Sequence, residues 1–297
     1  MPRKPGVYWT ESWNPVTGCP PDEHNVVCRE RCWARATAER FPQTHGRRAG
    51  KILIGFGHHD AMLPIPFSEI VLHPDRLDQP LHWKKPRVVA VCWMGDWMHD
   101  EVPTRFLDQM LDVMGATPQH TYLTLTKRPE NLDAKLYGVT EEHGCRELGG
   151  GDYLPNLWMG ATIWDQPSAD RVLPIILSTP AAHRWMSYEP ALGPLDLDSE
   201  SADGLHALGC GEDEHRGHSG YPQCQGLDQV ILGSESGPKR RPMPHAWARS
   251  IRDQCAEAGV PLYYKQAGEN EDGTGRVVKE PTLDGKQHLD LAWEAER

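Results

Sequence analysis

The sequence predicts an α/β protein in which strands and helices alternate, arranged as a complete or partial parallel (β/α) barrel of about six to seven units. Three observations favour this fold class. After residue 80, short β-rich apolar runs recur along the chain, a polar or glycine-bearing turn follows each run, and helical stretches separate them. Several runs are almost continuously apolar, which is typical of parallel strands covered on both faces.

Six runs carry the strand signal, and a further strand is expected near the N-terminus. The six are Val88–Trp93, Thr121–Thr126, Leu157–Thr162, His183–Ser187, Gln229–Gly233 and Val260–Lys265. The expected first strand is Val7–Thr10. Together these runs give six or seven βα units, which is why a partial barrel is as compatible with the sequence as a closed one.

Two of the intervening helices can be read directly. Pro103 suits the first turn of a helix, and a stripe of apolar residues at helical spacing follows it, formed by Leu107, Met110, Leu111 and Met114. The stretch His245–Ala258 places Trp247, Ile251 and Cys255 four residues apart and ends before Gly259, a good C-terminal stop. We expect these apolar side chains to lie in the core.

Two regions interrupt this pattern within what we expect to be a single domain over residues 1–297. Residues 42–86 are rich in Pro, His and Arg, with only a short apolar run at Ile52–Phe56. Residues 198–226 are polar, acidic and glycine-rich, as in a surface insertion. The insertion holds the candidate ligands of a second metal site, namely Cys210, Cys224, His206, His215 and His218, but lacks the compact Cys-x₂-Cys pair typical of zinc loops.

Composition limits the class of protein further. The chain has 297 residues and a net charge of −11, which argues against binding nucleic acid by bulk electrostatics and leaves room for a local basic groove. The longest apolar run, Val88–Met94, is too short to cross a bilayer, and the first residues show no apolar signal segment. We therefore expect a cytoplasmic protein with no membrane partner.

Polar residues follow nearly every predicted strand. In a parallel barrel such positions gather at one mouth, where active sites lie. A single polar residue there is usually a helix cap or an ion pair at the rim, whereas a ring of them is harder to explain by capping alone. The candidates are Gly95, Asp96, Thr126, Lys127, Arg128, Trp164, Asp165, Glu189, Ser234, Glu235 and Lys265.

Three of the eight cysteines crowd near the N-terminus. Cys19, Cys28 and Cys32 have the spacing Cys-x₈-Cys-x₃-Cys. Three thiolates can hold three irons of a [4Fe–4S] cluster and leave the fourth iron open for the amino and carboxylate groups of S-adenosylmethionine (SAM). Structural zinc, with His24 completing a Cys₃His set, fits the spacing equally well.

The cysteine region also carries a resemblance. Trp13-Asn14-Pro15-Val16-Thr17-Gly18-Cys19, with Cys28 and Cys32-Trp33-Ala34, resembles a phage- and prophage-associated family of poorly characterised proteins that looks like a distant branch of the radical SAM superfamily. Further segments match in order, over roughly residues 8 to 270: Lys85-Pro86-Arg87, Met94-Gly95-Asp96, Thr117–His120, Leu125–Pro129, Glu189–Pro194, Gly233–Gly237 and Arg241-Pro242-Met243.

The resemblance implies a radical SAM-like partial barrel, a [4Fe–4S] cluster on the three cysteines, and SAM as the second cofactor. It implies that Gly95 and Asp96 meet the methionyl amino group. It also implies that residues at later strand ends bind the carboxylate and ribose of SAM. These residues are Thr126, Lys127, Glu189, Ser234 and Glu235. Eight and three residues separate the cysteines, where the phage family has about six and two. Arg31 stands where an aromatic residue usually precedes the last cysteine, so adenine stacking falls to Trp33.

These observations predict a radical SAM enzyme of the lyase, isomerase or base-modifying type. Reductive cleavage of SAM would give a 5′-deoxyadenosyl radical that abstracts hydrogen from a substrate, for which a nucleobase or nucleotide in DNA modification or repair is the candidate. A flavodoxin or ferredoxin would supply the electron. Candidate substrate contacts are Asn14, Arg128, Trp164, Asp165 and Lys265, with Trp93 and Trp97 as stacking partners and Gly46–Lys51 and Lys239–Arg241 as phosphate contacts.

Two alternatives remain at this point. One is a zinc-stabilised nucleic-acid-binding or nuclease-like protein without radical chemistry, in which the acids of the mouth bind a different metal. The other is a catalytically inactive barrel that serves as the partner of another phage protein.

Overall fold

The fold is built on one eight-stranded sheet. The computed structural model describes residues 4–20, 32–54, 57–137, 154–197, 207–209, 226–237 and 239–295, with the backbone alone over 50–60. The strands of the sheet are β1 (Glu11–Trp13), β6 (Val88–Val91), β7 (Thr121–Thr124), β8 (Leu157–Ile163), β9 (His183–Tyr188), β10 (Gln229–Gly233), β11 (Leu262–Gly268) and β12 (Val277–Lys279). They lie side by side in chain order, all parallel up to β11, and β12 pairs antiparallel with β11 at the edge.

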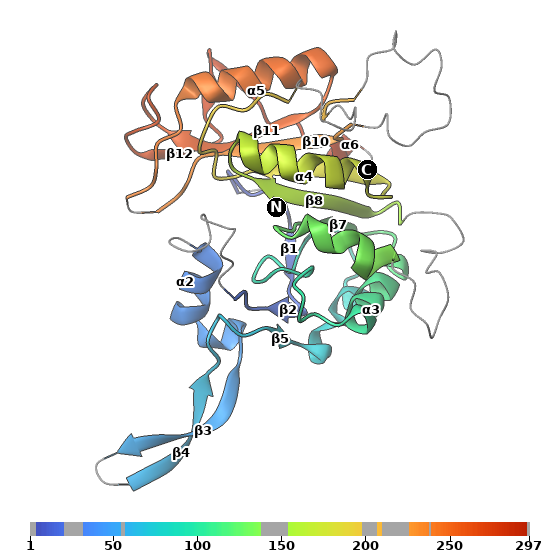
Figure 1. The fold of residues 1–297 in the computed structure, drawn as a ribbon, viewed down its shortest axis with the longest axis vertical. Coiled ribbons are helices and arrows are strands. Elements are labelled where there is room, and N and C mark those ends of the chain that lie inside the picture. The colour runs from blue at the N-terminus through green and yellow to red at the C-terminus, as the bar shows by residue number, and fades with distance from the viewer. Residues whose placement is uncertain are drawn as a thin grey trace.

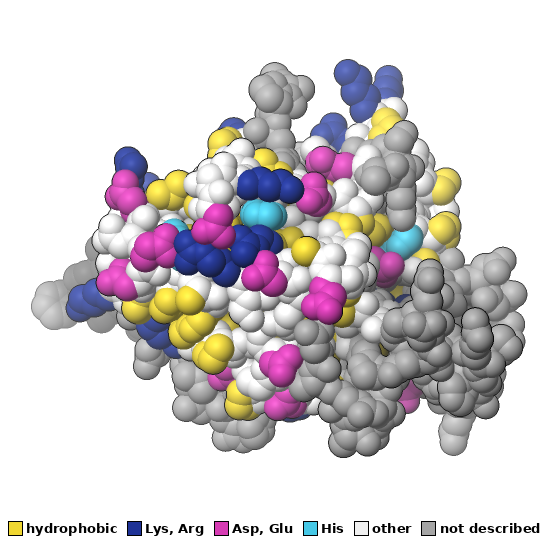
Figure 2. Space-filling model, turned by 90° about the horizontal axis from the view of Figure 1, so that it is seen from above, with side chains coloured by type: hydrophobic (Ala, Val, Ile, Leu, Met, Phe, Trp, Pro, Cys, Tyr) yellow, Lys and Arg dark blue, Asp and Glu magenta, His cyan; other side chains and the backbone are white. Residues whose placement is uncertain are grey.

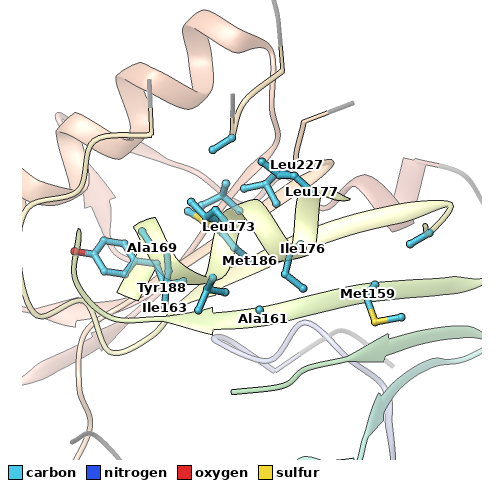
Figure 3. Packing of buried hydrophobic residues seen from close by; sticks show 14 of the residues in the cluster. Met159, Ala161, Ile163, Ala169, Leu173, Ile176, Leu177, Met186, Tyr188 and Leu227 are labelled. Carbon is cyan, nitrogen blue, oxygen red and sulfur yellow. The ribbon is translucent and has the colours of Figure 1, made fainter. Parts of the chain in front are cut away.

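Three helices cover one face of this sheet. They are α3 (Thr104–Gly115), α4 (Gln166–Ser178) and α5 (His245–Ala258), and Figure 1 shows them as connections between consecutive strands. Figure 3 shows Ile163 of β8 and Met186 of β9 packed against Leu173 of α4. Because side chains alternate along a strand, every second residue of β8 and β9 faces these helices, and the others face the opposite, inner side.

The inner side carries a cluster of aromatic rings. Tyr8, Trp158 and Trp185 are buried there around Trp293 of α6 (Ala292–Ala295), and Tyr263 packs against Tyr8. The C-terminal segment is fixed near the beginnings of the strands, since the Ala292 N–H donates to the Gln229 side chain at 2.8 Å. The amino ends of the strands are therefore filled on the inner side, and polar residues gather at the carboxyl ends.

The long connection from β1 to β6 forms a separate group of small elements. It contains β2 (Val16–Thr17), α2 (Trp33–Arg40), η1 (Pro42–Thr44), β3 (Arg47–Ile54), β4 (Gly57–Pro64), β5 (Val71–Leu72), η2 (Pro74–Arg76) and η3 (Gln79–His82). β2 pairs with β5, and β3 pairs with β4 as a hairpin that projects away from the sheet in Figure 1. The shorter remaining elements are η4 (Pro129–Asn131), η5 (Asp133–Tyr137), β13 (Thr282–Leu283) and β14 (Lys286–Gln287).

Most of the predicted elements are confirmed. All six strand runs are strands with ends shifted by up to three residues, and the helix at His245–Ala258 has the predicted bounds. Gly259 ends that helix with a φ of +69°, as a left-handed C-terminal residue should. Pro103 precedes the first residue of α3. The expected α/β class with a mostly parallel sheet is present.

One expectation about the chain needs correction, and another concerns residues that lie outside the described ranges. The first strand is Glu11–Trp13 rather than Val7–Thr10, because the segment before it crosses to the last strands, where the Gly6 N–H donates to Glu280 at 3.0 Å. The insertion at 198–226 lies almost entirely outside the described residues, as do Cys210, Cys224 and the three histidines with them. No helix in the described ranges is long and apolar enough to span a membrane.

Candidate functional site

Cys19 and Cys32 lie on one small apolar cluster at the carboxyl edge of the sheet. Both pack against the cluster that Phe67 and Met94 form with two alanines of α2, Ala34 and Ala38. The Cys19 N–H donates to the Phe67 carbonyl at 2.8 Å, which fixes the backbone at that cysteine. Two of the three predicted cluster ligands therefore border the same apolar cluster. Cys28 and the alternative ligand His24 lie outside the described residues.

Each of the two sulfurs accepts an N–H from an electropositive group. Cys32 is the N-cap of α2, and its Sγ accepts from the Arg35 backbone N–H at 3.4 Å. Cys19 Sγ accepts from Nη1 of Arg128 at 3.7 Å. Hydrogen bonds of this kind to a ligating sulfur orient the sulfur and tune a metal centre. The two sulfurs therefore sit in surroundings that suit metal or cluster ligands.

The turn before Cys19 is held by a buried hydrogen-bond network. Thr17 Oγ1 contacts Nδ1 of His45 at 2.9 Å and Nε2 of His73 at 2.7 Å. Burial lowers the pKa of both histidines, and the pKa of His73 falls to about 4 because Arg76 adds to the effect of burial. Both side chains are therefore neutral at pH 7.

Gly18 and Gly95 allow the cysteine turn to lie directly against the turn after β6. The Gly18 N–H donates to the Met94 carbonyl at 2.9 Å, and the two glycines form a parallel bridge. A Cβ at Gly95 would stand 2.9 Å from the Gly18 carbonyl oxygen, and Gly18 has a φ of +90°. Asn14 Oδ1 accepts the Met94 N–H at 3.0 Å, so this predicted substrate contact holds the turn in place.

Asp96 is the hub of the residues around Cys19. Its carboxylate accepts from the Met98 N–H at 3.1 Å, Thr126 Oγ1 at 2.8 Å, the Lys127 N–H at 2.9 Å and Arg128 Nη1 at 3.4 Å. Its exposed fraction is only 4%. Each carboxylate oxygen thus accepts from two donors, and the Asp96 carboxylate holds Arg128 beside Cys19.

A second polar cluster lies on the inner side of the sheet, around Glu189 and Lys265. Nζ of Lys265 is 2.9 Å from Oε1 and 3.0 Å from Oε2 of Glu189. Ser187 donates to Oε2 at 3.4 Å, and Lys265 stands over the ring of Tyr8 at 5.6 Å. Burial, with Glu189 nearby, raises the pKa of Tyr8 well above its ordinary value, so its hydroxyl stays neutral.

One turn connects the two clusters. Cys92, at a φ of +55°, follows β6, and Trp93 then joins the inner aromatic cluster whereas Met94 packs with the two cysteines. Burial raises the pKa of the Cys92 thiol to about 12, which makes Cys92 unsuitable as a thiolate ligand.

The remaining predicted residues have protein partners of their own. Glu235 forms a two-pronged ion pair with Arg241, at 2.6 Å and 3.1 Å. Asp165 caps α4, since its carboxylate accepts the Ser168 N–H at 2.9 Å, and the backbone N–H of Trp164 donates to Ser168 Oγ. The Ser234 N–H donates to the Gln266 carbonyl.

The ring of polar residues at the strand ends thus divides into groups instead of lining one site. Asn14, Gly95, Asp96, Thr126, Lys127 and Arg128 lie by Cys19, whereas Glu189 and Lys265 form the inner cluster. Trp33, the first residue of α2, is 56% exposed, which leaves its ring open to a ligand.

Sequence reasoning missed Tyr8, Ser187 and the pair His45 and His73. The alternation of residues along the strand His183–Tyr188 could have placed Ser187 on the same face as Glu189. The two histidines had no comparable signal, because residues 42–86 show no regular pattern.

The face of the molecule over α5 carries charges of both signs. Arg249 pairs with Glu271 and Asp284, and Arg252 also pairs with Asp284. Figure 2 looks down on this side and shows Lys and Arg side chains set among Asp and Glu. Such a surface gives no bulk attraction for a phosphate backbone. In the predicted basic segment 239–241, Arg240 already donates to the Gly273 and Gly275 carbonyls.

The fold and the site define an α/β protein with a cysteine site at the carboxyl edge of a parallel sheet. In the described part of the chain, no group of three or more Cys, His, Asp or Glu is placed to hold a metal ion, and the third cysteine is not among those residues. Residues 4–292 match the family DUF5131, described as a protein of unknown function, and the chain belongs to that family. No curated protein and no solved structure gave a significant match.

Proposed function

We propose that the protein is a radical SAM enzyme in which Cys19, Cys28 and Cys32 hold a [4Fe–4S] cluster. The observation that carries the proposal is the placement of Cys19 and Cys32 on one apolar cluster, each accepting an N–H from an electropositive donor. Three cysteine thiolates leave one iron without a protein ligand. When bound, such a cluster would supply the electron that splits the sulfonium C–S bond of SAM into methionine and a 5′-deoxyadenosyl radical.

We also propose that the sheet is an open partial barrel. Its strands follow chain order from β1 to β11, as in a succession of βα units. Residues before β1 reach the other edge of the sheet, where Gly6 contacts Glu280 and Tyr8 lies 5.5 Å from the ring of Tyr263. These contacts support a sheet that curls around the inner aromatic cluster, so that both polar clusters border one interior.

In this proposal the residues around Cys19 hold and shield the metal site. Arg128 donates to Cys19 and is fixed by Asp96, while Thr126 and Lys127 hold Asp96 in turn. Backbone groups near Gly95 and the side chain of Lys127 are the candidates for the methionyl group of SAM. Trp33 is the candidate for adenine stacking, because its ring is exposed beside Cys32. Ser234 and Glu235 remain candidates for the ribose.

The implied partners follow from this chemistry. A flavodoxin or ferredoxin would deliver the electron, and the substrate would be a nucleobase or nucleotide that reaches the inner side of the sheet. A site built from reduced thiols favours the cytoplasm as the location.

Oxygen-free purification tests the proposal. We expect brown protein with about four irons and four sulfides per chain, which releases 5′-deoxyadenosine from SAM when reduced. Cys28→Ala should abolish this release while the thermal unfolding transition persists. Cys255→Ala is the matched control, since Cys255 lies buried in the helix-side core, and it should keep the iron. Colourless protein with one zinc per chain would overturn the proposal and support the alternative in which the cysteines hold a structural zinc ion.

A further inference from the structure

The inner side of the sheet holds polar groups that the metal site does not use. The helix-facing residues of β8 and β9 are apolar, as Figure 3 shows for Ala161, Ile163 and Met186. Their neighbours Thr162 and Ser187 therefore face the inner side, and they are direct partners in the parallel register of β8 and β9. Glu189 follows Ser187 by two residues, so it extends the same row toward the carboxyl end.

The pair Glu189 and Lys265 is built into this row rather than placed at random on the surface. A Cβ at Gly233 would collide with Oε1 of Glu189, so the glycine leaves room for the carboxylate in its present position. Side-chain exposure is 13% for Glu189 and 19% for Lys265, so both groups are shielded but reachable. Oε2 of Glu189 already accepts from Lys265 and Ser187, whereas Oε1 accepts from Lys265 and keeps capacity for another donor; Lys265 has a third N–H.

Aromatic rings border this pair. Tyr8 lies beneath Lys265, and the ring of Trp93 is 5.6 Å from that of Tyr8. Trp93 is partly exposed, and its ring also packs at 4.5 Å against that of Trp9. The surroundings of the ion pair are thus flat apolar surfaces, which suit a planar ligand.

Among the described residues on the inner side, four buried polar atoms have no protein partner: the indole nitrogens of Trp158 and Trp293 in the aromatic cluster, and two atoms at Thr162 and Trp93 toward the carboxyl ends. Thr162 is 2% exposed and its Oγ1 makes no hydrogen bond, and the indole Nε1 of Trp93 makes none either. A buried polar group without a partner costs free energy, so such atoms commonly mark a position that water or a ligand fills.

We propose that Thr162, Ser187, Glu189 and Lys265, with the ring of Trp93, form the binding site for the nucleobase of the substrate. A nucleobase is planar, and one edge carries both N–H donors and carbonyl or ring-nitrogen acceptors. Glu189 takes the N–H groups, Lys265 donates to an acceptor, and Trp93 stacks on the ring. The hydroxyl of Thr162 meets the remaining edge.

The charges of the cluster argue for this class of ligand over others. A free phosphate would meet the carboxylate of Glu189 as well as the ammonium of Lys265, and an alkyl chain would leave both without new partners. A neutral base keeps the ion pair intact and adds hydrogen bonds to its free positions. The assignment rests on the proposed function for the reaction itself, but binding of the base does not require SAM cleavage.

Titration of the full-length, anaerobically purified protein with guanosine, adenosine, cytidine and uridine tests the assignment, using calorimetry and quenching of tryptophan fluorescence. We expect at least one nucleoside to bind, with free ribose 5-phosphate and methionine binding much more weakly. Thr162→Val preserves shape and removes the hydroxyl, and it should weaken nucleoside binding by about fivefold or more. Glu189→Gln should weaken it further. Release of 5′-deoxyadenosine in the absence of substrate should stay unchanged in Glu130→Gln, a variant remote from both polar clusters.

Glu130→Gln is the matched control, because Glu130 forms an exposed pair with Arg171 on the helix side. If Glu189→Gln fails to fold, Thr162→Val alone decides the matter. Wild-type protein that binds no nucleoside, or binds ribose 5-phosphate or methionine as well, overturns the assignment. If SAM is still cleaved in that case, the proposed function stands without it, and loss of both activities in wild-type protein counts against both.

Discussion

The guanidinium of Arg128 lies against the sulfur of Cys19, with Nη1 3.7 Å from Sγ. The same nitrogen lies 3.4 Å from Oδ2 of Asp96, so one nitrogen joins the carboxylate to the cysteine. Arg128 comes from the segment after β7, Asp96 from the turn after β6, and Cys19 from the segment after β2. Consecutive strand ends of the parallel sheet bring Asp96 and Arg128 together, and the bridge between Gly18 and Gly95 places Cys19 beside them.

Arg128 should therefore control the electronic properties of a cluster bound at Cys19. Arg128→Gln removes a positive charge and an N–H donor to the ligand sulfur, which stabilises the oxidised form and lowers the reduction potential. If the contact contributes about 1.4 kcal/mol, the potential falls by about 60 mV for this one-electron couple. A redox titration followed by electron paramagnetic resonance measures the change.

Two further variants serve as controls for that redox titration. Arg128→Lys keeps the charge and should give a smaller shift, and Arg171→Gln alters an exposed arginine and should give none. If the reduction potential stays the same in Arg128→Gln while the iron content is intact, the contact between Arg128 and Cys19 does not influence the cluster.

Asp96 should act mainly through Arg128 and the backbone of the following turn. Asp96→Asn removes the charge that pairs with buried Arg128, and the free energy of unfolding should fall by about 3 kcal/mol. Urea unfolding measures this loss, with Asp78→Asn, which breaks an exposed pair with His82, as a control expected to change stability little. A variant as stable as the wild type that binds SAM more weakly would instead assign Asp96 to the cofactor.

Glycine is required at position 18 for two reasons, its backbone conformation and the lack of space for a Cβ. Its φ is +90°, and a Cβ there would overlap the Glu69 carbonyl oxygen. Gly285 has a similar φ of +82°, with nothing within 4 Å of an added Cβ. Gly285→Ala should therefore cost only the conformational term, about 1 kcal/mol.

Gly18→Ala should cost well above that value, because the backbone must shift, and it should lower iron content as Cys19 moves. Thermal unfolding and iron analysis of both variants give the comparison. Equal losses of stability in the two alanine variants would show that the contact with Glu69 relaxes easily.

The regular part of the fold could be predicted because burial on both faces leaves a clear pattern. Val88–Val91 and Gln229–Gly233 are buried at every position, and both read as apolar runs. The hairpin of β3 and β4 could not be predicted in the same way. It projects from the sheet, and Arg47, Arg48 and Ala49 at its start are all exposed, so no alternation of buried and exposed residues marks the beginning of β3.

The site was predictable only as a set of residues at strand ends. Sequence position places Asp96, Glu189 and Glu235 in equivalent positions after their strands, but it does not reveal their partners. Glu235 forms an ion pair with Arg241, and Glu189 forms one with Lys265. Asp96 pairs with Arg128 and accepts from three other donors. These pairings depend on side-chain placement in three dimensions, which spacing along the chain does not specify.

The buried network beneath the cysteine turn should make the protein sensitive to acid. His45 Nε2 lies 2.9 Å from the Pro66 carbonyl and donates to it, which leaves Nδ1 as the acceptor of the Thr17 hydroxyl hydrogen. The same hydroxyl then accepts from Nε2 of His73. Protonation of His45 would turn Nδ1 into a donor and break this arrangement.

The sign of the effect follows from the lowered pKa values. The pKa of His73 falls from 6.5 to about 4 on folding, and the pKa of His45 falls as well. Between pH 6.5 and about pH 4 the unfolded chain binds protons that the folded chain does not. The free energy of unfolding therefore keeps the full contribution of these histidines above pH 6.5, and this contribution declines as the pH falls toward 4. The loss attributable to His73 is about 2–3 kcal/mol.

Urea unfolding at several pH values between 7 and 4 measures this decline. His73→Gln keeps an N–H donor toward Thr17 and cannot titrate, so its stability should fall less steeply with acid than that of the wild type. Carboxylates contribute to the acid response of both proteins, and Asp75 and Arg76 lie close to His73, so the difference between the two slopes is the quantity to compare. His82→Gln, which alters an exposed histidine, should retain the wild-type slope. Parallel slopes for His73→Gln and the wild type would mean that His73 takes up its proton without disturbing the turn that carries Cys19.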